Sequence, residues 1–271
     1  MNESLFSLPA DLYRNRRLVL KLARNDFRTR YAGSYLGTVW AFIQPVVTVL
    51  LYWFVFSVGF RQNTGNLGLP FVLYLLSGIV PWFFFQDALV GGTNALIEYS
   101  YLVKKVVFNI SVLPVVKIIS ALFVHGFFVL FTVFLYACYG RFPDLFYLQI
   151  LYYSGSMFLM VLGLCYVTCS VVVFFRDLSQ IIGIGLQVGV WLTPIMWVAE
   201  DSLQGHRTLQ MILKLNPMYY IVSGYRDAFI FKRWFFEHPA WTVYFWVFTI
   251  LCFLLGNRVF RRLRVHFADV L

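Results

Sequence analysis

The chain has 271 residues, of which 61% are hydrophobic and only 13% are charged, and its net charge is +10. A soluble domain carries about 25% charged residues, so this chain has too few charges to cover a surface exposed to water. The composition therefore excludes an ordinary soluble domain and indicates a helical bundle dissolved in a bilayer. The basic residues lie at the chain ends and between apolar runs, where anionic lipid head groups attract them, so we expect no nucleic-acid partner.

The N-terminal segment, 1–31, is predicted to be cytoplasmic and to contain a basic amphipathic helix over 11–31. Cations recur there at spacings of three and four residues, which places them on one helical face: Arg14, Arg17, Lys21, Arg24 and Arg28. A second, apolar stripe comprises Leu20, Ala23, Phe27 and Tyr31. Such a helix lies in the membrane interface, where it is either a plain anchor or meets the phosphate of a lipid-linked substrate. Arg30 is a further candidate for that phosphate contact.

Six uncharged stretches are long enough to cross the hydrocarbon core, which needs about 20 apolar residues. We expect these membrane helices at 36–60, 67–86, 118–140, 146–175, 178–198 and 239–257. Basic residues flank both chain ends, so the positive-inside rule places both termini in the cytoplasm and requires an even number of crossings. The sequence therefore predicts an all-α membrane protein, with one transmembrane domain over 1–271.

The stretch between the last two predicted helices, 199–240, is too apolar for an ordinary loop and too charged to span the membrane. Two short re-entrant helices that dip into the outer leaflet would fit it. A plain amphipathic surface helix fits it equally well.

The second predicted cytoplasmic segment runs from Gly91 to Pro114. Thr93 or Asn94 could cap a short helix through Leu102, with the Lys104–Lys105 pair at its C-terminal end. This helix would be a docking site for a cytoplasmic partner. A structured loop without such a role is the alternative.

Aromatic residues make up 20% of the chain. Interfacial belts account for many of them, and we assign 82–85 and 234–236 to such belts. Aromatic side chains inside the bundle could instead stack on sugar rings, and the candidates for lining a channel are Trp40, Tyr52, Trp53 and Trp191.

Chemistry-bearing motifs are scarce. His125 is the one ionisable side chain well inside a predicted helix, and we interpret it as a neutral hydrogen-bonding residue rather than a proton carrier. Cys165 and Cys169 share a helix face but have no third ligand nearby in sequence, so no metal site is assigned. The sequence contains no P-loop, no nucleophile elbow and no zinc-protease motif, and no catalytic residue is assigned.

Several short motifs resemble the type-2 ABC transporter permeases that export lipid-linked polysaccharides. The run from Arg30 to Gly37, with Trp40 and Pro45, resembles the entry to their first membrane helix, and 75–82 resembles the second. Further matches in the family's order are 94–97, 102–106, 113–114, 175–177, 193–196, 216–217 and 225–226. One departure is Asn109, which follows Phe108 where the family usually has a proline.

The resemblance implies a homodimer in the bacterial inner membrane that pairs with two copies of a separate ATP-binding subunit. ATP and Mg²⁺ would bind to that subunit, and this chain would hold no cofactor. The motion of the ATP-binding subunit would be passed on to this chain through 94–105. The coupling residues would be Asn94, Glu98, Tyr101, Lys104 and Lys105. The substrate would be an O-antigen-type glycan linked to a lipid pyrophosphate, and 203–231 would be an outer gate. Capsule and teichoic-acid exporters are close alternatives, and a membrane-embedded glycan-modifying enzyme is the alternative from another class.

Overall fold

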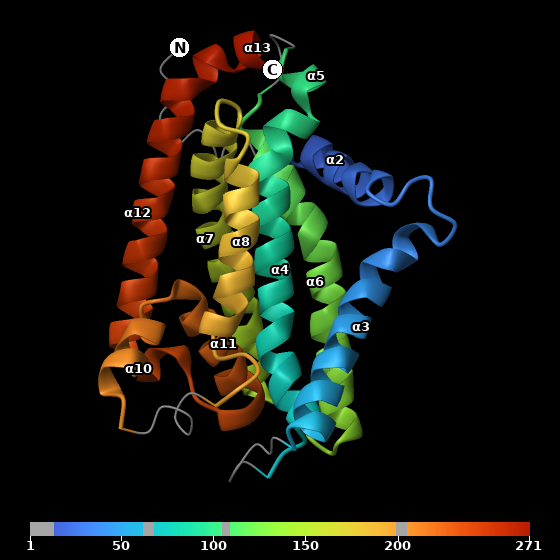
Figure 1. The fold of residues 1–271 in the computed structure, drawn as a ribbon, viewed down its shortest axis with the longest axis vertical. Coiled ribbons are helices and arrows are strands. Elements are labelled where there is room, and N and C mark those ends of the chain that lie inside the picture. The colour runs from blue at the N-terminus through green and yellow to red at the C-terminus, as the bar shows by residue number, and fades with distance from the viewer. Residues whose placement is uncertain (1–13, 62–67, 105–108, 199–204) are drawn as a thin grey trace.

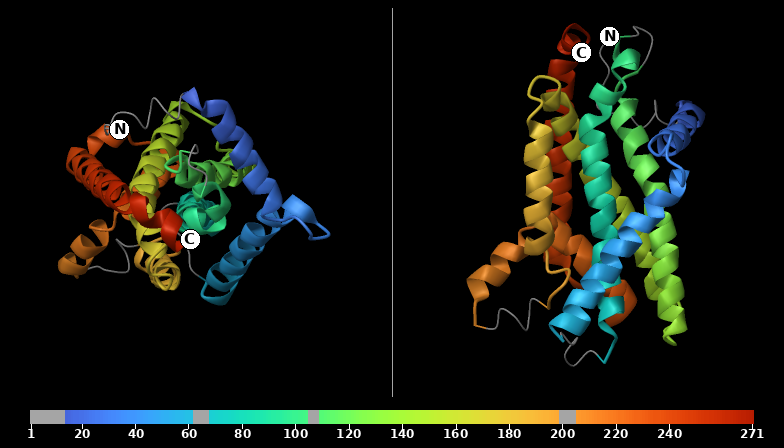
Figure 2. Two further views of the ribbon diagram at one scale, coloured as in Figure 1. Left: turned by 90° about the horizontal axis from the view of Figure 1, so that it is seen from above. Right: turned by 45° about the vertical axis from the view of Figure 1, so that its right-hand side comes forward.

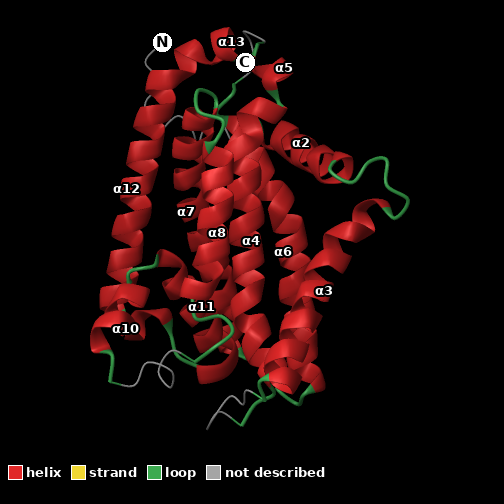
Figure 3. Ribbon diagram, viewed as in Figure 1, coloured by secondary structure: helices red, strands yellow, loops and turns green. Residues whose placement is uncertain are grey.

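The computed structural model describes residues 14–61, 68–104, 109–198 and 205–271, and every regular element in these ranges is a helix (Figure 3). Five helical stretches there are long and apolar enough to cross a membrane: Gly37–Gly59, Phe71–Glu98, Val112–Cys138, Leu145–Val172 and Pro239–Val270. A sixth apolar helix, α8 (Leu178–Leu192), has 15 residues and lies beside the others (Figure 1). The all-helical fold of the prediction is therefore confirmed for the described residues, with five candidate spans of full length.

The main helices follow one another with short connections. They are α2 (Arg16–Thr29), α3 (Trp40–Trp53), α4 (Phe71–Glu98), α5 (Ser100–Val103), α6 (Val112–Cys138), α7 (Gln149–Val172), α8, α10 (Arg207–Lys214), α11 (Pro217–Arg226), α12 (Pro239–Leu263) and α13 (Phe267–Val270). Single turns extend several of them, namely η1 (Gly37–Val39), η2 (Phe54–Gly59), η4 (Leu145–Leu148), η5 (Asp227–Phe231), η6 (Phe235–Glu237) and η7 (Arg264–His266).

Helix α4 forms the centre of the bundle, and α3 lies at its edge. In the most apolar 18-residue stretch of each, 72% of the residues of α4 are buried, against 11% for the stretch that contains α3. Figure 2 shows α3 inclined to the other long helices at one edge of the bundle, with α2 joined to one of its ends. The core is therefore built from α4, α6, α7 and α12, whereas α3 leaves most of its surface uncovered.

Close backbone contact joins α7 to α12. A Cβ atom at Gly163 would lie 2.8 Å from the backbone nitrogen of Phe253, and one at Gly256 would lie 2.5 Å from the carbonyl oxygen of Gly163. Small residues permit such approach between membrane helices, where dispersion contacts replace the hydrophobic effect as the main attraction. The two glycines thus fix the spacing of this pair.

The two ends of the bundle differ. One end, called the basic end below, holds α2, α5, the α7–α8 turn and α13, whereas α10, α11 and η6 lie at the other end (Figure 1). The predicted amphipathic helix is present, with described bounds Arg16–Thr29. Two short helices also occupy the predicted segment between the last two long helices; α10 is largely exposed, whereas α11 is buried against α4 and α7.

Several predicted boundaries were wrong because charges were taken as helix ends. The predicted helix 67–86 begins at Phe71 and continues through Asp87 to Glu98, and the predicted helix 118–140 already begins at Val112, before Lys117. No new capped helix begins at Thr93 or Asn94, since both residues lie inside α4. Both charges are tolerated within helices because each has a partner of opposite charge.

Helix α8 ends at Leu192, six residues before its predicted end at 198. Pro194 explains the difference, because a proline disfavours helical geometry in the preceding residue. Thr193 is accordingly extended, with ψ 123°. The segment after it, from Thr193 to Met196, is buried although it is not helical.

Candidate functional site

A buried ion pair joins α2 to α6 at the basic end. The Lys117 ammonium nitrogen lies 2.6 Å from Asp26 Oδ1, and both side chains are 5% exposed. The Tyr99 hydroxyl donates to the same oxygen at 2.8 Å, and the lysine also contacts the Glu98 carboxylate. Asp26 therefore tethers the amphipathic helix to two other elements.

A second pair extends this cluster along α4, away from its end at Glu98. Arg30 Nη1 donates to both carboxylate oxygens of Asp87, at 2.7 and 2.8 Å, and Arg30 Nη2 lies 3.6 Å from Asp26 Oδ2. Together Asp26, Arg30, Asp87, Glu98, Tyr99 and Lys117 form what we call the basic-end network. It connects α2, α4 and α6 through side chains that are far apart in the sequence.

Charge and burial compete within the network. Burial alone would raise the pKa of Asp26, but the hydrogen bond and positive charge of Lys117, with weaker help from Ser120 and Tyr99, hold that pKa below its ordinary value. Burial likewise opposes the charge on Arg30, whereas the Asp87 carboxylate raises its pKa. Asp26 and Arg30 are therefore charged at neutral pH, and they fix the position of α2 electrostatically.

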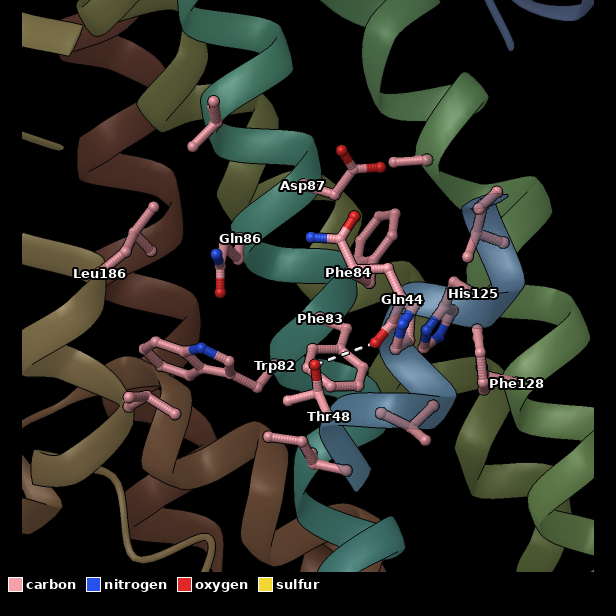
Figure 4. A pocket seen from close by; sticks show the side chains of 18 of the residues that line it. Gln44, Thr48, Trp82, Phe83, Phe84, Gln86, Asp87, His125, Phe128 and Leu186 are labelled. Atoms are coloured by element: carbon pink, nitrogen blue, oxygen red, sulfur yellow. Dashed lines mark hydrogen bonds between the residues drawn. The ribbon is translucent and has the colours of Figure 1, made fainter. Parts of the chain in front are cut away.

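A cavity of ≈ 580 Å³ opens beside Asp87, between α3, α4, α6 and α8 (Figure 4). Its polar lining consists of Tyr31, Gln44, Thr48, Tyr52, Gln86, Asp87, His125 and Gln187. Aromatic and aliphatic side chains complete the wall, among them Trp82, Phe83, Phe128 and Trp191. Scattered amides and hydroxyls between apolar surfaces are typical of a pocket that binds and orients an organic ligand.

Trp82 is the most unusual residue of this wall. Its side chain is 2% exposed, and its indole nitrogen has no hydrogen-bond partner in the described structure. Figure 4 shows the ring pointing from α4 towards Leu186 of α8, with the nitrogen on the side that faces Gln86. A buried donor without an acceptor costs about 1–3 kcal/mol. The indole N–H is thus a buried donor whose hydrogen bond is not made within the described residues.

Comparison with known proteins assigns the family. The model of the ABC-2 type transporter family matches residues 17–230, which is most of the chain. The chain belongs to this family. An O-antigen export system permease protein RfbA of Myxococcus xanthus is 28% identical over 84% of this chain and 86% of its own length. Two proteins of the same name from Klebsiella pneumoniae are 26% and 24% identical, each over 94% of this chain and 95% of its own length.

Membership of the ABC-2 type transporters has three consequences. The chain is a multi-pass protein of the bacterial inner membrane, and it is a transport permease rather than an enzyme. It associates with a separate ATP-binding subunit. The predicted family and localisation are therefore confirmed.

The predicted coupling residues of the ABC-2 permease lie in two different settings. Asn94 is inside α4, where its side-chain oxygen accepts a hydrogen bond of 2.7 Å from Ser179 of α8. Glu98 ends the same helix in contact with Lys117, whereas Tyr101 and Lys104 are exposed at the basic end. Lys105 lies outside the described residues. The coupling role of all five residues remains a prediction.

The basic face of α2 is open to the surroundings. Arg14, Arg17, Lys21, Arg24 and Arg28 are all exposed, as a helix on an anionic surface would require. Arg30 differs from them because Asp87 and Asp26 already contact its guanidinium. Of the predicted apolar stripe, Ala23 is buried and Phe27 and Tyr31 are half-buried, whereas Leu20 is exposed and the neighbouring Val19 is buried in its place.

Only part of the predicted aromatic set lines the cavity. Tyr52 and Trp191 do, whereas Trp40 and Trp53 are exposed on α3 outside its lining. Trp82 was assigned to an interfacial belt, but it lies within α4 and is buried. Uncharged amides inside the apolar runs, such as Gln44 and Gln187, were the sequence signal that could have located the cavity.

His125 is hydrogen-bonded, as the sequence predicts. Its Nε2 lies 2.9 Å from the Tyr225 hydroxyl and 3.2 Å from Ser154 Oγ, and these two oxygens are 2.6 Å apart. This contact joins α6, α7 and α11 within the bundle. Within the described ranges, no group of three or more His, Cys, Asp or Glu side chains is arranged to hold a metal ion.

Proposed function

We propose that the chain is the permease subunit of an ATP-driven exporter that moves a lipid-linked O-antigen-type polysaccharide across the inner membrane. The carrying observation is the match to O-antigen export permeases over 84–94% of the chain. The cavity agrees with it, because amides and hydroxyls bind sugar hydroxyls and aromatic rings pack against the C–H faces of sugars.

The proposed topology has six crossings, with α8 as the sixth and both termini in the cytoplasm. The basic end carries the exposed cations of α2 and those at the end of α12, and an excess of Lys and Arg marks the cytoplasmic side. The segment with α10 and α11 then faces outward. There it acts as a re-entrant outer gate, fastened to the residue that follows α8 by the 2.8 Å hydrogen bond from Asn216 to Thr193.

The proposed assembly is a homodimer with two ATP-binding subunits. Gln44 of α3 and Gln187 of α8 are exposed in the isolated chain, inside helices that are otherwise apolar. Amides that face lipid are costly, because hydrocarbon offers them no hydrogen bonds. A second copy that covers α3 and α8 would enclose these amides together with the cavity, which would then line a shared passage.

ATP and Mg²⁺ are bound by the partner subunit, and the permease holds no cofactor. The ATP-binding subunit docks on the segment 94–105. When that subunit closes on ATP, it moves the end of α4. Because α4 is continuous from Glu98 to Trp82, this motion reaches the cavity wall directly. The basic-end network carries the same motion to α2, whose exposed cations contact lipid phosphates.

The test is deletion of the gene in its native host, followed by staining of whole and permeabilised cells for the glycan. The proposal predicts that polymer is still made but stays inside, and that the intact gene restores surface polymer. Absent or altered polymer, with normal expression of the synthesis enzymes, would favour a glycan-modifying enzyme. Trapped capsule or teichoic acid with normal O-antigen would replace the substrate but keep the transport function.

A further inference from the structure

A second cavity lies on the far side of Trp82, between α4, α8 and α10. It has a volume of ≈ 400 Å³. Its floor consists of the buried residues Phe85, Leu89, Leu186 and Met218, and the side chains of Leu192 and Ile212, more than half exposed, form its rim. The groove is therefore open to the lipid along its rim and closed towards the core.

The polar group at this groove, other than Trp82, is already engaged. Asn216 donates to Thr193 Oγ1 at 2.8 Å, and its side-chain oxygen accepts from the backbone nitrogen of Met218 at 3.0 Å. The remaining lining residues are apolar or glycine. A hydrocarbon chain is the ligand that such a surface accepts without leaving a polar group unsatisfied.

Trp82 and Leu186 line both cavities, so the apolar groove and the polar cavity share one wall. The wall is thin because Gly189 leaves room for the indole: a Cβ atom there would lie 2.9 Å from Trp82 Cη2. The buried, unpartnered indole nitrogen belongs to this shared wall. The arrangement offers a hydrocarbon surface on one side and hydrogen-bonding groups on the other.

The depth of this wall identifies the occupant. Trp82 lies eleven residues after Phe71, the first residue of α4, which corresponds to about 16 Å along a helix, or about half of the hydrocarbon thickness. A phospholipid at rest keeps its head group at the membrane interface, so it would not use polar groups at this depth. An amphiphile whose polar part is crossing the membrane would use both sides of the wall at once.

We propose that the groove holds the hydrocarbon chain of the lipid carrier while the polar part attached to it lies in the neighbouring cavity. This inference rests on the proposed function, and it assigns a second subsite to the substrate. The shared wall keeps the two parts of the substrate on opposite sides of Trp82.

Photo-crosslinking tests the assignment in the full-length permease, assembled with its ATP-binding subunit in phospholipid nanodiscs. A photoreactive amino acid replaces Ile212 at the rim of the groove, or Val247 on the exposed face of α12 as a control. The probe is a radiolabelled long-chain polyprenyl diphosphate. We expect labelling at Ile212 to exceed that at Val247 severalfold, and unlabelled long-chain diphosphate to compete far better than geranyl diphosphate, which has the same head group.

Two glycines of α8 provide matched variants. Gly185 lines the groove and Gly183 does not, and at both positions an added Cβ would meet open space. Gly185→Leu fills the groove, and loss of burial for about two methylene groups lowers affinity about tenfold. Gly183→Leu should keep the labelling of the parent.

Equal labelling at Ile212 and Val247 would overturn the inference, as would equal competition by the short and long diphosphates, since either means ordinary lipid contact or head-group binding alone. The competition experiment uses the parent chain, so it tests the hydrocarbon subsite even if the Gly185→Leu variant fails to fold. Failure of the proposed function is distinguished by the deletion strain: if the parent gene restores surface glycan while the groove stays unlabelled, only the subsite is wrong.

Discussion

Lys117 of α6 and Asp26 of α2 form a buried ion pair whose charged atoms are 2.6 Å apart. The pair attaches an amphipathic helix to the bundle by charge, although the neighbouring face of that helix is suited to lie on lipid. Movement of α2 away from α6 would leave a carboxylate and an ammonium buried without each other, so the two helices move together.

Replacing Lys117 by methionine should destabilise the protein strongly. Removal of Lys117 leaves the buried Asp26 carboxylate with the 3.6 Å contact to Arg30 and the hydrogen bond from Tyr99, and breaking a buried pair costs about 3–5 kcal/mol. The measurement is urea denaturation of the purified chain in detergent. The double variant Asp26→Leu/Lys117→Met is the control, because replacing both charges by apolar groups is often close to neutral. Equal losses in the single and double variants would show that the charge itself is not the cause.

The contact between Arg30 and Asp87 should matter more for export than for stability. The side chains are 25% and 41% exposed, and partly exposed pairs contribute only about 1 kcal/mol or less. We expect Arg30→Asp and Asp87→Arg each to reduce surface glycan with little change in the melting temperature. The double variant, which exchanges the charges, should regain export. Export that stays normal in both single variants would remove this pair from the transport pathway.

Gly224 should not tolerate a side chain. A Cβ atom there would lie 2.1 Å from ring atoms of Tyr153, which is itself buried. Gly224→Ala must displace that ring, and we expect a loss of about 1–3 kcal/mol, typical of an overpacked core. Gly155→Ala is the matched control, since its Cβ would meet open space and alanine favours a helix by up to about 1 kcal/mol. The measurement is thermal unfolding followed by tryptophan fluorescence. The melting temperature of Gly224→Ala should lie below that of the parent, and that of Gly155→Ala should lie above it.

Asp227, which directly follows helix α11, should make stability depend on pH near neutrality. Burial raises the pKa of this carboxyl from 3.8 to about 6, the charges of His238 and Arg233 oppose that rise, and Glu237 adds to it. A raised pKa in the folded state means that its stabilising contribution is complete below about pH 3.8 and is lost as the pH rises through about 6.

Asp227→Asn should remove this loss. We expect the variant to gain stability at pH 7.5 relative to the parent and to gain clearly less at pH 4.5, measured as urea midpoints in the same detergent. An equal gain at both pH values would indicate a packing effect instead of titration.

The positions of the long helices could be predicted from the sequence because uncharged runs match the hydrocarbon thickness. The errors arose at Asp87 and Lys117, which were taken as helix ends because an isolated charge is costly in a membrane. Their partners, Arg30 and Asp26, stand 57 and 91 positions earlier in the chain. Pairing over such separations has no local signal in a single sequence.

The candidate site was predictable only where a periodic pattern existed. The exposed cations of α2 follow from their spacing, whereas the cavity depends on how four separate helices meet. Trp82 illustrates the limit, because a tryptophan followed by three phenylalanines is typical of an interfacial belt. Its burial is decided by Gly189 and Leu186 of α8, which are more than 100 positions away.

The shortness of α8 has a consequence for the bilayer itself. Fifteen residues of helix are about 22 Å long, against about 30 Å for the hydrocarbon core, and a short apolar element is matched by local thinning of the membrane. Both cavities lie along this helix. With α8 as the sixth crossing of the proposed topology, the apolar barrier would be thinnest where the cavities lie, and a charged head group that crosses beside α8 would have a shorter distance to travel away from water.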